Sequence, residues 1–229
     1  MFFWDPTMII IIPGLLIAMY AQAKVQSAYH KYSRIESAKG ATGMQVARQL
    51  LEDQGIFDVQ VELGQGQLTD HYDPQKKVIR LSPGVYQGTS LASLAVAAHE
   101  TGHAIQHNEG YVPLGLRSAI APGVQFASTA AMPLFFIGLL FSFSSLVRIG
   151  IYLFAAVVIF QLITLPVEFN ASSRAMAALE RHDFITADEY PGTRSVLSAA
   201  ALTYVAAVLM SLLQLLRLLA IAGIGRRDD

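Results

Sequence analysis

The sequence predicts a mainly α-helical membrane protein with about four transmembrane helices and one small α+β domain. Hydrophobic residues make up 53% of the chain and charged residues only 14%, whereas a soluble domain carries about 25% charged residues. A membrane-spanning helix needs about 20 mostly apolar residues. Stretches that meet or approach this requirement lie at residues 8–23, 123–146, 149–167 and 196–216.

These stretches divide the chain into five predicted segments. They are an N-terminal transmembrane segment (1–23), a polar domain (24–122), a transmembrane hairpin that turns near residues 144–148 (123–167), a second polar segment (168–195), and a C-terminal transmembrane segment with its tail (196–229). The first stretch has an alternative interpretation as a signal peptide, because Ala21-Gln22-Ala23 resembles a cleavage site. No Lys or Arg precedes its apolar run, which disfavours cleavage.

The polar domain has the patterning of a small α+β fold. Thr42 can cap a helix over residues 43–54. Residues 57–63 alternate between polar and apolar side chains as a strand does, and residues 77–81 predict a second strand. A further helix is expected over residues 90–107.

The distribution of Lys and Arg predicts the orientation, because basic residues favour the cytoplasmic side of a membrane. They are concentrated in the two polar segments, at Lys24, Lys31, Arg34, Lys39, Arg48, Arg174, Arg181 and Arg194. We therefore expect both polar segments on the cytoplasmic side. Arg226 and Arg227 conflict with this orientation if the last stretch crosses fully, so that stretch is either an exception to the rule or re-entrant or interfacial.

Charge and cysteine content narrow the class of protein further. The net charge is −1, so nothing indicates binding to nucleic acid. The chain has no cysteines, which excludes disulfides and thiolate metal sites. A metal would have to be bound by histidine and carboxylate. The sequence does not indicate an oligomeric state.

The strongest local signal is the H-E-x-x-H pattern of His99-Glu100-Thr101-Gly102-His103. Residues four apart lie on one face of a helix, so both imidazoles can bind one zinc ion from adjacent turns. Glu100 lies about 100° around the helix from His99, where it can reach a water on the metal rather than the metal itself. The pattern predicts a catalytic zinc site with Glu100 as base. The alternative is an ordinary pair of polar helix positions.

A catalytic zinc normally has three protein ligands, so a third one is needed. His107 continues the spacing of four, but it would lie about 12 Å along the helix axis from His99, too far for shared coordination. Glu109 would need a sharp chain reversal, and Gln106 stands where a Gly would permit it. Glu168 is the better candidate, because a carboxylate at the end of an apolar span needs a partner and the hairpin returns the chain to the same membrane surface. The alternative is a simple interfacial carboxylate.

The H-E-x-x-H pattern, the two apolar stretches after it and then Glu168 give nearly the whole chain a resemblance to a known family. It resembles the YugP-type neutral zinc metallopeptidases of bacteria, and more distantly the HtpX-type membrane gluzincins. The resemblance includes the N-terminal span and residues 68–74, 97–106 and 168–172. It implies a zincin-like cytoplasmic domain in a multi-pass protein of the bacterial inner membrane. It also implies a Zn²⁺ cofactor bound by His99, His103 and Glu168, with Glu100 as the catalytic base.

One position departs from the wider gluzincin pattern. Many gluzincins carry an Asp four residues beyond the third ligand, where it braces a zinc histidine, but this chain has Ser172. Either Ser172 braces the histidine more weakly, or another group such as Asp70 does so.

The function that these features predict is a membrane-bound endopeptidase acting on membrane-associated or unfolded polypeptides, with the lipid bilayer as its other partner. Zinc would activate a water for attack on the peptide bond, and His71, Tyr72 or Arg174 would stabilise the oxyanion. Two alternatives remain: an inactive metal-binding membrane scaffold, or a metal- or haem-handling membrane protein that uses His107 as well. Glu100 argues against the first, and the scarcity of ionisable residues in the spans argues against the second.

Overall fold

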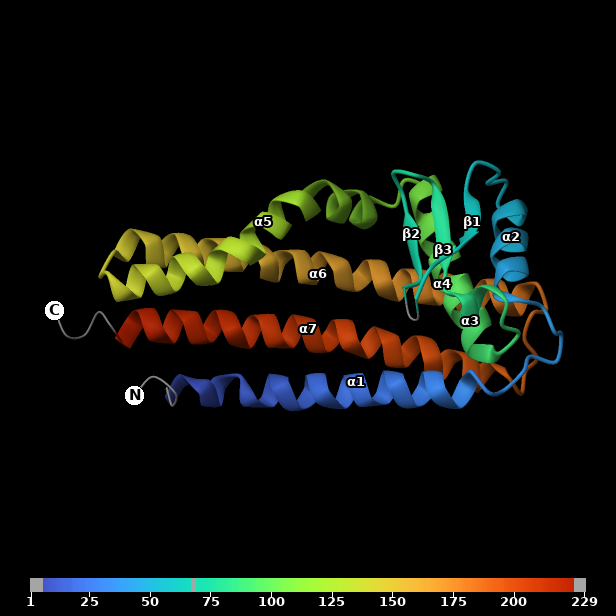
Figure 1. The fold of residues 1–229 in the computed structure, drawn as a ribbon, viewed down its shortest axis with the longest axis horizontal. Coiled ribbons are helices and arrows are strands. Elements are labelled where there is room, and N and C mark those ends of the chain that lie inside the picture. The colour runs from blue at the N-terminus through green and yellow to red at the C-terminus, as the bar shows by residue number, and fades with distance from the viewer. Residues whose placement is uncertain (1–5, 67–68, 225–229) are drawn as a thin grey trace. The chain divides into compact units, whose positions relative to one another are not determined.

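The structure is a computed structural model that describes residues 6–66 and 69–224, and Figure 1 shows the order of its elements. The helices are η1 (Pro6–Ile10), α1 (Ile12–Tyr32), α2 (Gly43–Asp53), α3 (Pro83–Tyr86), α4 (Leu91–Asn108), α5 (Val112–Leu140), α6 (Ser144–Arg181) and α7 (Tyr190–Ile224). The strands are β1 (Gln60–Leu63), β2 (His71–Asp73) and β3 (Val78–Leu81). The mainly helical fold with one small sheet is confirmed.

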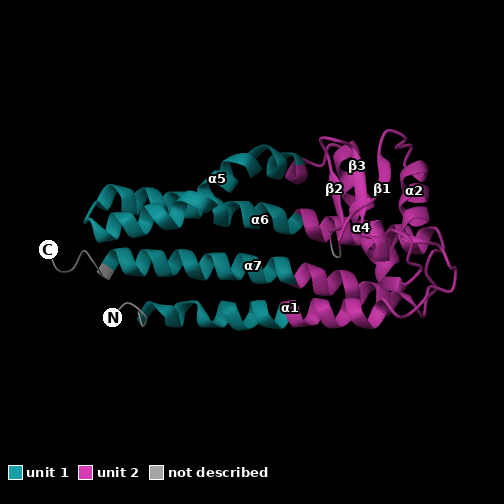
Figure 2. Cartoon of the chain, viewed as in Figure 1, with its two compact units in different colours: residues 1–21, 115–166, 203–229 teal, residues 22–114, 167–202 magenta. Residues whose placement is uncertain are grey.

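The chain forms two compact units, which Figure 2 distinguishes by colour. Unit 1 comprises the described parts of residues 1–21, 115–166 and 203–229, and unit 2 comprises residues 22–114 and 167–202 without the two undescribed positions. Each unit has its own hydrophobic core.

Three helices of the described residues are long and apolar enough to cross a membrane. They are α5, α6 and residues 190–223 of α7. The stretch at residues 8–23 falls on η1 and the first half of α1, and α1 is not among the three because polar residues from Gln22 onward interrupt its apolar run. A fourth span therefore stays a prediction.

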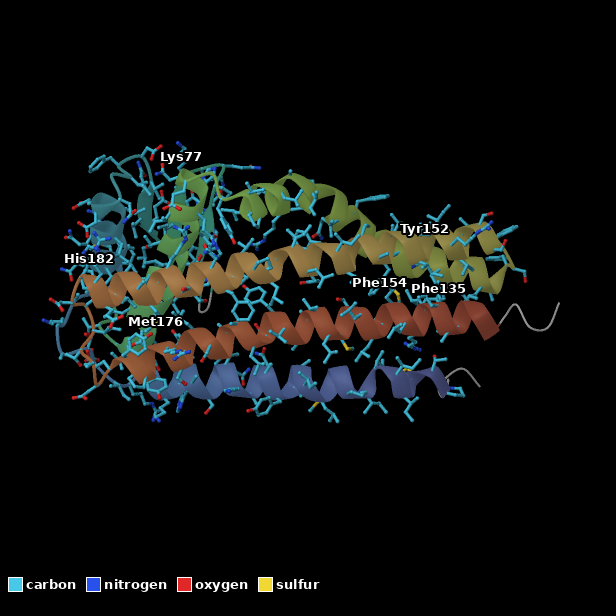
Figure 3. The ribbon with its side chains drawn as sticks, turned by 180° about the vertical axis from the view of Figure 1, so that it is seen from behind. Lys77, Phe135, Tyr152, Phe154, Met176 and His182 are labelled. Atoms are coloured by element: carbon cyan, nitrogen blue, oxygen red, sulfur yellow. The ribbon has the colours of Figure 1, made fainter. Side chains whose placement is uncertain are left out.

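Small residues let α5 and α6 approach closely in unit 1. A Cβ built on Gly138 would lie 2.6 Å from the backbone nitrogen of Val147, so no larger residue fits there. Val147 is buried with Phe135 and Leu218, and Phe154 packs against this cluster (Figure 3).

The turn of this hairpin is earlier in the chain than expected. It comprises residues 141–143, with Ser142 at a φ of 57°, and α6 already begins at Ser144. The expected turn at residues 144–148 was therefore wrong, and Arg148 lies within α6. The second polar segment also begins as helix, since α6 continues through Pro166 to Arg181.

The sheet of unit 2 has the strand order β1-β3-β2. β1 pairs with β3 in parallel and β2 pairs with β3 antiparallel, with Val61 and Tyr72 both opposite Ile79. Both predicted strands are present but begin later than expected. β2 was not predicted from the sequence, because a three-residue strand has too little alternation to be recognised.

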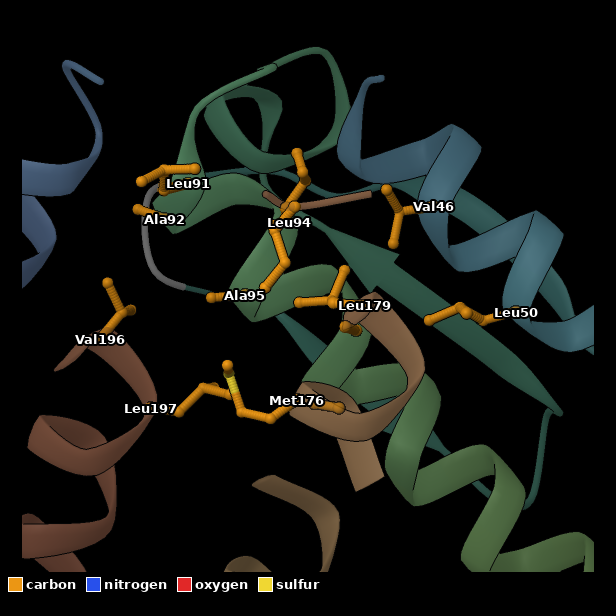
Figure 4. Packing of buried hydrophobic residues seen from close by; sticks show 13 residues of the cluster. Val46, Leu50, Leu91, Ala92, Leu94, Ala95, Met176, Leu179, Val196 and Leu197 are labelled. Atoms are coloured by element: carbon orange, nitrogen blue, oxygen red, sulfur yellow. The ribbon is translucent and has the colours of Figure 1, made fainter. Parts of the chain in front are cut away.

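Helix α4 occupies the centre of unit 2. Ser90 caps it, as Thr42 caps α2 through a capping box with Gln45, so both predicted helices are confirmed. One face of α4 packs against α2, α6 and α7 in the cluster of Figure 4, which includes Leu94 and Leu179. Other α4 residues join α2 and the sheet in a second cluster. Because α4 is packed on several sides, the side chains of its central turns are held in fixed positions.

Candidate metal centre

Two histidines of α4 and one glutamate of α6 converge within unit 2. One ligand atom from each of His99, His103 and Glu168 lies within 4.8 Å of the others. The Glu168 Oε2 atom is 3.2 Å from His99 Nε2 and 3.5 Å from His103 Nε2. The two imidazole rings stand edge to face, with centroids 4.8 Å apart. The structure thus brings together the three residues that were predicted from the sequence as metal ligands.

Helix geometry and one glycine explain this convergence. The spacing of four places His99 and His103 on one face of α4. Gly102 lies against α6, where a Cβ would be 2.9 Å from the carbonyl oxygen of Ala171. Glu168 lies three residues before Ala171 and therefore on the same face of α6.

The donor set fits a zinc ion. Glu168 is only 2% exposed and His103 only 9% exposed, and a buried carboxylate needs a compensating positive charge. Two imidazole nitrogens and one carboxylate form a His₂Glu set, which is an attested zinc ligand set. Burial lowers the pKa of His103, but the hydrogen bond to Glu168 and the charges of Glu100 and Glu168 outweigh it and raise that pKa above its ordinary value. The two glutamates thus place negative charge beside the imidazole of His103.

The other ring nitrogen of each histidine also has a partner. His99 Nδ1 is 3.2 Å from Ser172 Oγ, so Ser172 lies in the position from which it was expected to brace a histidine of the site. His103 Nδ1 is 3.0 Å from Gln106 Oε1. This contact of Gln106 was not predicted from the sequence. The signal for it was the spacing, because residues three apart on a helix are neighbours.

Asp70, the other candidate brace, is engaged elsewhere. Its carboxylate accepts hydrogen bonds from the backbone N–H of Ser82 at 2.7 Å and from the Ser82 hydroxyl at 3.0 Å. It therefore fixes the chain where β3 ends and α3 begins.

Two candidate oxyanion donors lie on the edge strand β2. The exposed His71 donates through Nδ1 to the carbonyl of Thr69 at 2.7 Å. The Tyr72 hydroxyl is 2.8 Å from Nδ1 of His107 on α4. Burial, together with the charges of Asp58 and Asp73, raises the pKa of Tyr72 to about 12, so its hydroxyl stays protonated at neutral pH.

The third candidate donor, Arg174, is held by two neighbours. Its Nε donates to Asn170 Oδ1 at 2.7 Å, and its guanidinium forms a 2.7 Å ion pair with Glu109. Glu109, rejected as a ligand from the sequence, is this partner instead. Glu100, the predicted base, is half-buried directly beside His99.

The likeness to known proteins covers almost the whole chain. A profile of the family described as "Putative neutral zinc metallopeptidase" matches residues 7–223. The chain is 51% identical over 218 residues to a protein of Bacillus subtilis (strain 168) named "Putative membrane protease YugP", and this alignment covers 95% of the chain and 97% of that relative. No solved structure matches significantly. The matched region includes all three residues of the candidate centre.

Proposed function

Because the chain belongs to the family described as "Putative neutral zinc metallopeptidase", we propose that it is a membrane-bound endopeptidase whose zinc ion is held by His99, His103 and Glu168. The observation that carries this proposal is the convergence of these side chains within 4.8 Å. The site contains the non-ligating Glu100 beside His99, and a purely structural metal site has no need of such a carboxylate.

Each residue has a defined role in the proposed reaction. When bound, zinc would polarise the scissile carbonyl and lower the pKa of a water toward about 7. The Glu100 carboxylate takes a proton from the attacking water and delivers it to the leaving amine. The imidazoles of His99 and His103 act as neutral ligands, with Nδ1 protonated toward Ser172 and Gln106 respectively.

The contacts of Arg174 reduce the number of candidates for the oxyanion donor. Its side chain is bound to Asn170 and Glu109, and turning it toward a substrate would break both contacts. His71 and Tyr72 remain as candidates, since each has one such contact to break, to the carbonyl of Thr69 and to His107 respectively.

The sheet supplies a binding surface for an extended polypeptide. Among the strands of the described residues, β2 lies at an edge of the sheet, so one side of its backbone pairs with none of them. The two edge strands are β1 and β2. We favour β2, because its Tyr72 hydrogen-bonds to His107 of α4, the helix that carries His99 and His103. A substrate strand added there would be held mainly by main-chain hydrogen bonds, with little selectivity for sequence.

The position of Glu168 in the chain suggests the substrate class. It follows directly after the apolar stretch at residues 149–167. Because each helical residue rises only about 1.5 Å, the proposed zinc site would lie close to the membrane surface. We expect it on the cytoplasmic side of the bacterial inner membrane, where the basic polar segments should face. Membrane-associated or unfolded polypeptides would reach such a site more readily than folded soluble proteins.

Substitutions at Glu100 and His99 distinguish the role of catalytic base from that of metal ligand. In the full-length protein purified in detergent, Glu100→Gln should keep zinc but lose peptide hydrolysis, because it removes only the base. His99→Ala should lose both. Zinc content is measured by metal analysis and hydrolysis with an unstructured fluorogenic polypeptide. Loss of zinc from both variants alike would refute the base assignment, and zinc binding without chelator-sensitive cleavage by the wild type would indicate an inactive scaffold.

A further inference from the structure

Gln106 is a fully buried amide on α4 that is hydrogen-bonded at both ends. Its Oε1 accepts the Nδ1 proton of His103 at 3.0 Å. Its Nε2 donates to the carbonyl of Val167 at 2.9 Å and to Asn170 Oδ1 at 2.8 Å. A buried amide is costly unless its donors and acceptor are paired, so these bonds select one orientation of the side chain.

The three partners of Gln106 belong to the two helices that carry the metal ligands. His103 is itself a proposed ligand, one turn earlier on α4, and Val167 immediately precedes Glu168 on α6. One amide group therefore contacts a ligand on one helix and the residue beside a ligand on the other. Displacement of Gln106 would affect both sides of the site.

A second layer holds this bridge in place. Asn170 Oδ1 also accepts from Arg174 Nε at 2.7 Å, and Arg174 forms an ion pair with Glu109 at the C-cap of α4. The chain of contacts thus starts at His103, crosses to α6 and returns to the end of α4. Arg174 fixes the Asn170 oxygen in the position where it receives the Gln106 amide.

We infer that Gln106 is a positioning residue for the zinc site, resting on the proposed function. It orients the imidazole of His103 so that Nε2 faces the metal, and it ties the backbone beside Glu168 to the same helix. Partners that orient metal ligands in this way typically change metal affinity by about 10–100-fold when they are removed. Asn170 is the outer support of the same bridge.

The test measures zinc affinity of the full-length protein in detergent, by competition with a chelating dye. Gln106→Leu should bind zinc about 10–100-fold more weakly, because it keeps the volume but removes both ends of the bridge. With Co²⁺ in place of zinc, its visible absorption spectrum should also change, since the orientation of one ligand is no longer fixed. Affinity and spectrum equal to wild type would overturn the inference.

A second pair of variants covers the case that Gln106→Leu does not fold. Asn170→Leu should weaken zinc binding, whereas Asn170→Asp should stay close to wild type because it keeps an oxygen that can accept from Gln106 and Arg174. The inference is wrong if the two Asn170 variants bind zinc equally well. Far-UV circular dichroism of the metal-free proteins checks that each is folded.

Two control variants identify the cause of any loss of zinc affinity. Thr193 is also fully buried in unit 2 and donates its hydroxyl to the carbonyl of Glu189 at 3.0 Å, and Glu189 is neither a proposed ligand nor a partner of Gln106. Thr193→Val should therefore keep zinc affinity, and an equal loss there would show a general effect of destabilisation. His103→Ala tests the proposed site itself. If it binds zinc as wild type does, the proposed function fails; if it loses zinc while Gln106→Leu does not, only the positioning role fails.

Discussion

Gly102 of α4 faces the backbone of Ala171 of α6 so closely that a Cβ on Gly102 would lie 2.9 Å from the Ala171 carbonyl oxygen. Gly102 is adjacent to His103, and Ala171 lies three residues after Glu168. The separation between the histidine pair and the carboxylate is therefore set by the absence of a side chain. The backbone carbonyl of Ala171 cannot turn away as the tip of a flexible side chain could.

We predict that Gly102→Ala lowers the free energy of unfolding by about 1–3 kcal/mol through overpacking and weakens zinc binding. Alanine is intrinsically better than glycine in a helix by about 1 kcal/mol, so a net loss has to come from the contact. The measurements are thermal unfolding and zinc titration in detergent. Gly123→Ala is the matched control, since a Cβ at Gly123 of α5 meets no other described atom within 4 Å beyond its chain neighbours and its own helix backbone. Equal behaviour of the two variants would show that the close contact is unimportant.

The orientation of the chain can be tested by single-cysteine labelling, for which this protein needs no prior substitutions because it has no cysteines. We expect Lys39→Cys and Arg181→Cys to react with a membrane-impermeant maleimide only from the cytoplasmic side, and Ser145→Cys only from the opposite side. Intact and opened cells provide the comparison. Labelling of Lys39→Cys and Arg181→Cys from opposite sides would separate α4 from Glu168 and remove the proposed site.

The hydrogen bonds of the Glu189 carboxylate lead us to expect that the protein loses stability on acidification. Its oxygens accept hydrogen bonds from the N–H groups of Ala38 and Thr186, each at 2.7 Å. Burial raises its pKa, but the N–H groups of Thr186 and Ala38 outweigh this and hold the pKa below its ordinary value of 4.5. A lowered folded-state pKa stabilises the fold above pH 4.5, and this contribution is lost as the pH falls through the folded-state pKa.

We therefore expect metal-free wild type to unfold at a higher temperature than Glu189→Gln at pH 7, with the difference shrinking below pH 4.5. Keeping the protein metal-free excludes an effect of zinc loss. Asp188→Asn is the control, because Asp188 is an exposed carboxylate next in the chain. A difference between wild type and Glu189→Gln that does not change with pH would contradict this account.

The preference for membrane-associated substrates can be tested with one unstructured polypeptide in two forms. With the enzyme in nanodiscs, we expect the form that carries a lipid anchor to be cleaved faster than the soluble form, because the anchor holds it at the depth of the proposed site. Glu100→Gln supplies the background rate. Equal rates for both forms, abolished alike by a zinc chelator, would keep the peptidase and refute the membrane preference.

The sequence alone determined the features that depend on near neighbours in the chain. His99 and His103 share a face because they are four residues apart on a helix, and Thr42 caps α2 through Gln45 three residues later. Glu168 could also be singled out from the sequence as a candidate ligand, because a carboxylate at the end of an apolar stretch requires a partner.

Only the tertiary structure decided which distant groups meet. Gln106 reaches Val167 across 61 positions, Tyr72 pairs with His107 across 35, and Asp70 binds Ser82 rather than either histidine of the proposed site. No local pattern encodes these contacts. The contact of Gln106 with Val167 depends on the close approach of α4 and α6 that Gly102 permits. The other two depend on how the sheet packs beside α3 and α4, which places each polar group within reach of its partner.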